Sequence, residues 1–157
     1  MNKKLTAYLR KRAELERYPL VVESTLDCPE TVIVIPALAE AHTLPHTLDS
    51  LTKCNHDLLA STLIIIVVNN RAPAHVDAEA LANNERTIEW LESIPYPTLH
   101  LNYIDASSAG QELKPKEGVG AARKIGMDRA FTCLLDSGCA TPLIVCLDSD
   151  TLVEANY

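Results

Sequence analysis

The chain contains 157 residues, 47% of them hydrophobic, and carries a formal net charge of −7. This length and composition are typical of a single globular domain and exclude a disordered chain. The 14 basic residues form no dense block, which argues against nucleic acid as a partner because binding to a phosphate backbone requires clustered Lys and Arg. Five cysteines without a Cys-x-x-Cys pair indicate reduced thiols in a cytoplasmic protein. The longest apolar run, 63–68, is too short to cross a bilayer.

The hydrophobic pattern predicts strands that alternate with helices. Apolar or β-branched runs indicate strands at 31–36, 61–68 and 141–147, and alternation indicates a further strand at 98–104. Apolar residues at helical spacing indicate helices at 3–17, 44–51, 76–94 and 119–135. Thr43 is the expected N-cap of the second helix. This order predicts an α/β fold with a mostly parallel, Rossmann-like sheet and helices on both faces. We divide the chain into a leading helix and connector, 1–30, and a main domain, 31–157.

The most informative polar residues are two carboxylates, Asp148 and Asp150, which directly follow the last predicted strand. Carboxylates beside a buried strand are costly unless something neutralises them. Oxygen ligands favour a hard cation such as Mg²⁺ or Mn²⁺, and such a cation favours a phosphate-bearing substrate. The alternative is a turn in which one Asp caps the next element.

Polar residues also follow the first two predicted strands, where ligands of parallel sheets bind. Pro36 ends the first strand and leads to Glu40, and the second strand ends in Asn69, Asn70 and Arg71. An Asn amide offers both a donor and an acceptor, which suits a base or ribose edge, and Arg71 could pair with phosphate. The alternative at each place is an ordinary solvated turn.

The helix at 119–135 begins with a glycine-rich, basic segment. Gly118 and Gly120 open it, Lys114 and Lys116 precede it, and Arg123 lies in its first turns. The N-terminus of a helix with basic neighbours is suited to an anion. A dinucleotide fingerprint should follow the first strand directly, whereas a long polar loop precedes this segment. A simple helix start with solvated lysines is the alternative.

These four segments, 32–40, 64–70, 118–126 and 143–150, resemble in their order the nucleotide-binding half of a family 2 glycosyltransferase with the GT-A fold. The resemblance covers about residues 31–157. It departs from the family pattern at Asn69 and Asn70, where two Asp are usual, and at Lys124, where Asn is usual.

The resemblance implies a nucleotide-sugar donor, an unknown acceptor and a bound Mn²⁺ or Mg²⁺ ion. Pro36, Ala37 and Glu40 would line the nucleotide pocket, together with Gly118. Asn69 or Asn70 would face the base, with Arg71 beside them, and Arg123 would approach the diphosphate. Asp148 and Asp150 would hold the cation, which neutralises charge on the departing nucleoside diphosphate.

The resemblance also places the general base of an inverting enzyme in an acceptor half beyond Tyr157. We therefore expect this chain to be the donor-binding part, with little or no sugar transfer alone, and membrane association only through a missing C-terminal part. A non-catalytic module that binds a nucleotide or nucleotide sugar is the main alternative. A nucleotidyltransferase-like protein is a further one, although no glycine-rich loop follows the first strand.

Overall fold

Four parallel strands form the centre of the computed structural model, which describes residues 3–21, 26–93 and 96–157. The strands are β1 (Thr31–Ala37), β2 (Thr62–Asn69), β3 (His100–Ala106) and β4 (Leu143–Cys146). Their order across the sheet is β3-β2-β1-β4. Thr31 of β1 lies opposite Thr62 of β2 and Leu143 of β4, so these three strands begin at the same level of the sheet. The predicted α/β architecture with a parallel sheet is confirmed, and it is consistent with a Rossmann-like fold.

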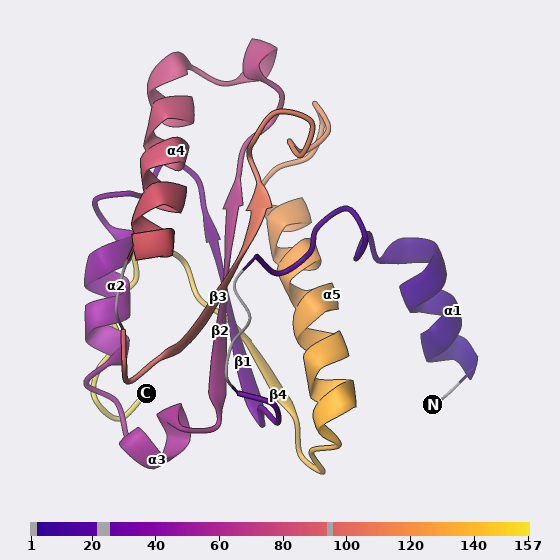
Figure 1. Cartoon of the computed structure of the whole chain (residues 1–157), viewed down its shortest axis with the longest axis vertical. Helices are drawn as coiled ribbons and strands as arrows, with labels where there is room; N and C mark the ends of the chain where they lie inside the picture. The colour runs from indigo at the N-terminus through magenta and orange to yellow at the C-terminus, as the bar shows by residue number, and fades with distance from the viewer. Residues whose placement is uncertain (1–2, 22–25, 94–95) are drawn as a thin grey trace.

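Helices cover both faces of the sheet (Figure 1). They are α1 (Lys3–Arg12), α2 (Leu44–Leu51), α3 (His56–Leu59), α4 (Ala78–Ser93) and α5 (Val119–Ser137), with a 3₁₀ turn, η1 (Pro73–His75). Alternate residues of β1 divide the core: Val34 faces α5, and Ile35 faces α2 and α4. All eight residues of β2 are buried, which explains its continuous apolar sequence. No helix in the described ranges is both long and apolar enough to traverse a bilayer.

The structure differs from the sequence prediction in the end of one helix, in two additional short elements and in one helix cap. Helix α1 ends at Arg12 rather than at residue 17, and the short elements α3 and η1 were not predicted. Thr43 occupies the N-cap position of α2 but makes no side-chain cap hydrogen bond, because its hydroxyl donates to the Glu40 carboxylate instead. The predicted end of the helix at residue 94 lies outside the described residues.

The N-terminal segment is attached to α5 and to the loop before it by polar contacts. The Tyr8 hydroxyl donates to the buried Asp128 carboxylate at 2.8 Å, and Lys124 Nζ donates to the Arg12 carbonyl at 2.7 Å. Arg17 donates to the Glu112 carbonyl at 2.8 Å. The segment thus supports α5 from outside the sheet.

Helix α5 approaches the sheet closely at Gly126. A Cβ atom at this position would clash with Cγ1 of Val34 and lie 3.0 Å from Cγ2 of Val67. Interiors are close-packed, so the side chains of β1 and β2 have little room to move away. The absence of a side chain at Gly126 therefore sets the distance between α5 and the sheet.

We predict that Gly126→Ala lowers the free energy of unfolding by about 1–3 kcal/mol, because overpacking outweighs the gain of about 1 kcal/mol in helix propensity. Gly120→Ala is the matched control, since open space surrounds that position of the same helix. It should be neutral or stabilising. Urea unfolding of both variants checks this, and equal stability of the two would contradict the packing argument.

Candidate functional site

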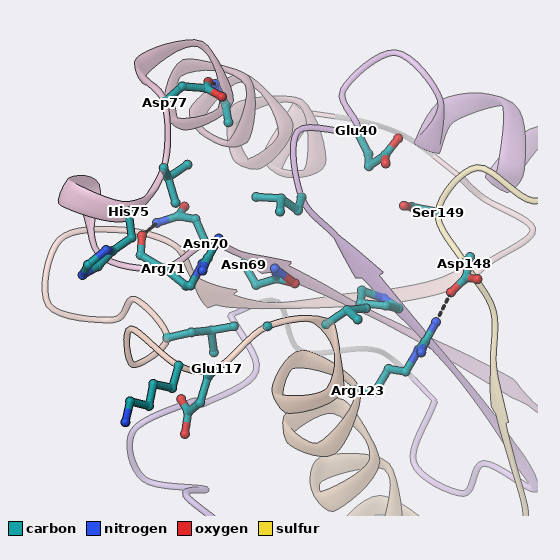
Figure 2. A pocket seen from close by; sticks show the side chains of 18 of the residues that line it. Glu40, Asn69, Asn70, Arg71, His75, Asp77, Glu117, Arg123, Asp148 and Ser149 are labelled. Atoms are coloured by element: carbon teal, nitrogen blue, oxygen red, sulfur yellow. Dashed lines mark hydrogen bonds and ion pairs between the residues drawn. The ribbon is translucent and has the colours of Figure 1, made fainter.

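A cleft of about 820 Å³ lies at the carboxyl ends of β1, β2 and β4, between the beginnings of α4 and α5. The sequence-predicted residues that line it are Pro36, Glu40, Asn69, Asn70, Arg71, Gly118, Arg123, Asp148 and Asp150. Figure 2 shows that Arg71 and His75 lie toward one end and that Glu40, Ser149, Asp148 and Arg123 lie toward the other. Segments that are far apart in the sequence therefore share one site.

Ala37 is the one predicted site residue that does not line the cleft. It is 1% exposed and belongs to the core on the α2 and α4 side of the sheet. Side chains of a strand alternate between the two faces, so Pro36 and Ala37 point in opposite directions. The prediction that both contact a ligand conflicts with this alternation.

Asp148 and Asp150 both reach the cleft because Ser149 between them is turned inward. Ser149 is buried, and its carbonyl accepts a hydrogen bond of 2.7 Å from Thr47 Oγ1 of α2. Further along, the Val153 N–H donates to Ser50 Oγ at 3.1 Å. Helix α2 thus holds the segment after β4 in place and turns the two carboxylates toward solvent.

The two carboxylates have different surroundings. Asp148 forms an ion pair with Arg123 of α5, and both side chains are partly exposed. No side-chain hydrogen bond or ion pair joins Asp150 to any residue that the structure describes. Because the Asp148–Arg123 pair is partly exposed, it contributes little stability. A cation bound to Asp148 Oδ1 would compete with Arg123 for that oxygen.

The donor set fits a divalent cation that is shared with a phosphate. Within the described residues, no three His, Cys, Asp or Glu side chains come together in a way that could enclose a metal ion. Mg²⁺ retains several waters and is usually held by one or two carboxylates together with substrate phosphates. Asp148 and Asp150 could supply such a pair, with the remaining ligands provided by water and the substrate.

The N-terminus of α5 offers the opposite electrostatic character. Gly118 is its N-cap and provides no side-chain acceptor, and the first turn contains no acidic residue. Gly118, Val119 and the basic residues Lys116 and Arg123 all line the cleft. Uncapped backbone N–H groups and the helix dipole favour an anion at this position.

The neighbouring asparagines Asn69 and Asn70 have different roles. Asn70 Nδ2 donates to the carbonyls of Arg71 at 2.9 Å and Ser107 at 3.2 Å, and its Oδ1 accepts from Asn84 at 2.8 Å. Asn69 is 3% exposed, and its buried Oδ1 has no partner among the described residues. A buried acceptor without a partner costs free energy, so Asn69 is the one of the two that is available to a ligand.

The loop after β3 holds the Asn70 side chain through the Ser107 carbonyl. Asp105 accepts hydrogen bonds from the Ser107 N–H, the Ser107 hydroxyl and the Ser108 N–H, each at 2.9 Å. Burial would raise the pKa of the Asp105 carboxyl, but these hydrogen bonds outweigh burial and lower its pKa below the ordinary value. The ionised carboxylate thus shapes the loop whose Ser107 carbonyl receives Asn70.

Several residues of the cleft and its surroundings were not predicted from the sequence. His75 lies on η1, and Asp77 accepts a hydrogen bond from the Ala80 N–H at the start of α4. The signal for both was Pro73, which begins the 3₁₀ turn that carries His75 and precedes Asp77. Asn84, which does not line the cleft but binds Asn70, was missed because it lies within a helix, where this contact has no local signature.

Neither a protein-family model nor a curated protein matches this chain. The function is therefore inferred from the chemistry of the cleft.

We predict that Thr47→Val loosens the segment that holds Asp148 and Asp150. The change keeps the volume but leaves the buried Ser149 carbonyl without its donor, which should cost about 1–3 kcal/mol. Hydrogen exchange should quicken at residues 148–151, and urea unfolding should show the loss of stability. Thr47→Ser, which retains the hydroxyl, is the control; if it behaves like Thr47→Val, the hydrogen bond is not the cause.

Proposed function

We propose that the cleft binds a nucleoside diphosphate sugar together with Mg²⁺ or Mn²⁺, and that the chain provides the donor-binding part of a GT-A-like glycosyltransferase. The observation that carries this proposal is the meeting of opposite charges in one cleft. The Asp148 and Asp150 carboxylates line the same cleft as the α5 N-terminus, and Arg123 of α5 pairs with Asp148.

A phosphate and a cation together satisfy both sides of this end of the cleft. A phosphate alone would be attracted by Arg123 and the helix N-terminus but repelled by the two carboxylates. When bound, the cation would neutralise the negative charge that develops on a departing diphosphate. Arg123, released from Asp148, would then be free to pair with a phosphate oxygen.

The rest of the cleft suits a nucleoside. Its volume of about 820 Å³ falls within the usual range of small-molecule pockets, roughly 300–1,000 Å³. Val76 and Leu113 provide apolar wall, and Asn69 Oδ1 provides a buried acceptor for an N–H or hydroxyl donor. Arg71 lies beside Asn70 in the cleft and forms no salt bridge with any described residue.

The proposal that the bound sugar is transferred rests on the order of the four segments that resemble family 2 glycosyltransferases. Transfer also requires a general base for the acceptor hydroxyl, and we assign that role to no described residue. A non-catalytic nucleotide-binding module would use the same cleft, and a transfer assay distinguishes the two.

We predict that UDP or GDP binds the purified chain in the presence of Mn²⁺ and that EDTA abolishes or strongly weakens this binding. The double variant Asp148→Ala/Asp150→Ala should lose the metal-dependent part. Isothermal titration calorimetry with and without Mn²⁺ measures both effects.

The control is Glu79→Ala/Glu89→Ala, which removes two exposed carboxylates from α4 and causes the same change in net charge. It should bind like the unmodified protein. If the folded chain binds neither nucleotide, or if binding is the same with EDTA, the proposal is wrong.

A further inference from the structure

Two neighbouring asparagines of α4 hold the connection between β1 and α2. Asn83 and Asn84 are 8% and 2% exposed. Asn84 Oδ1 accepts from the Ala39 N–H, and Asn83 Oδ1 accepts from the Ala41 N–H, each at 2.9 Å. The residue between these two N–H groups is Glu40, whose side chain lines the cleft.

Asn84 also binds the end of β2. Its Nδ2 donates to the Asn69 carbonyl at 3.0 Å and to Asn70 Oδ1 at 2.8 Å. The amide therefore uses both of its N–H donors and its oxygen acceptor. Through Asn84, the β1–α2 connection and the end of β2 are joined within one buried network, and a fully satisfied network of this kind is rigid.

The connection that these asparagines hold is conformationally strained. Ala39 has φ = 59°, and among the described residues it is the one non-glycine with a positive φ. The left-handed conformation costs a non-glycine residue roughly 1–2 kcal/mol. Such strain persists only where the surroundings impose it, and it is found most often at functional sites.

Asn84 does not bind the side-chain oxygens of Asn69 and Glu40, although the Glu40 carboxylate accepts a hydrogen bond from the Thr43 hydroxyl. Asn84 binds the backbone carbonyl of Asn69, so the Asn69 Oδ1 atom remains without a partner beside the cleft. It also binds the backbone next to Glu40 and leaves the Glu40 carboxylate in the cleft. The Asn69 Oδ1 atom and the Glu40 carboxylate are both hydrogen-bond acceptors, so the ligand groups that they suit are donors, such as ribose hydroxyls or a base N–H, rather than phosphate.

We propose that Asn83 and Asn84 are positioning residues that hold Glu40 and Asn69 in place to accept hydrogen bonds from the donor groups of the nucleoside. This inference rests on the proposed function, since it takes the ligand to be a nucleotide. The strain at Ala39 is the cost of presenting Glu40 in the required direction.

The decisive variant is Ala39→Gly, because strain and ligand binding should respond in opposite directions. Glycine adopts a positive φ without strain, so the melting temperature should rise by about 2–4 °C. The freer loop should weaken the binding of UDP in the presence of Mn²⁺ by about fivefold, the equivalent of one hydrogen bond. A merely structural role would raise the melting temperature and leave the affinity unchanged, and that result would overturn the inference.

Asn84→Ala provides the complementary test. It should lower the melting temperature and weaken UDP binding by at least about fivefold, whereas Glu85→Ala, an exposed change in the same helix, should alter neither appreciably. An unchanged affinity in Asn84→Ala would also count against the inference.

A readout without ligand keeps this inference separate from the proposed function. Amide hydrogen exchange at Ala39 and Ala41 should be slow in the unmodified protein and should quicken in the Asn83→Ala/Asn84→Ala variant. If exchange there does not change, the positioning role is wrong whether or not UDP binds. If exchange quickens but the unmodified protein binds neither UDP nor GDP, the proposed function fails, and the role of the pair as a positioner of nucleotide contacts fails with it.

Discussion

The parallel pairing of β1 with both β2 and β4 is the constraint on which the site depends. Because all the strands run in one direction, their carboxyl ends lie at the same end of the sheet, and the polar residues that follow them converge there. Close packing at Gly126 then brings the N-terminus of α5 to this end of the sheet. The cleft is therefore a consequence of strand direction and of the distance between α5 and the sheet.

The loops around this cleft are held mainly by side chains of neighbouring helices and strands. Thr47 of α2 holds the segment that carries Asp148 and Asp150, and Asn84 of α4 holds the connection that carries Glu40. A buried side-chain amide or hydroxyl that is bonded to backbone fixes a loop in one conformation without adding a strand or a helix. Asp148, Asp150 and Glu40 are therefore carried by loops that side chains of α2 and α4 hold.

The sequence sufficed for the parts of the structure that depend on local pattern. Apolar runs identified three strands and alternation identified β3, and Asp148 and Asp150 could be placed at a strand end because an apolar run precedes them. Contacts between distant residues could not be foreseen: nothing local to Asn70 or Asn84 indicates that their amides meet. Ala37 was misplaced for a different reason, since the predicted motif ignored the alternation of side chains along β1. The chemistry of the two adjacent asparagines became distinguishable only when their partners were known.

The ion pair between Arg123 and Asp148 has a consequence for thermodynamic linkage. The pair joins one nitrogen of Arg123 to one oxygen of Asp148. A cation that takes this oxygen and a phosphate that takes this nitrogen would each separate the same two side chains. Whichever arrives first bears the cost of separation, and the second binds to a partner that has already been released. If the cleft holds both, the two affinities are coupled, and by reciprocity each must raise the other by the same factor.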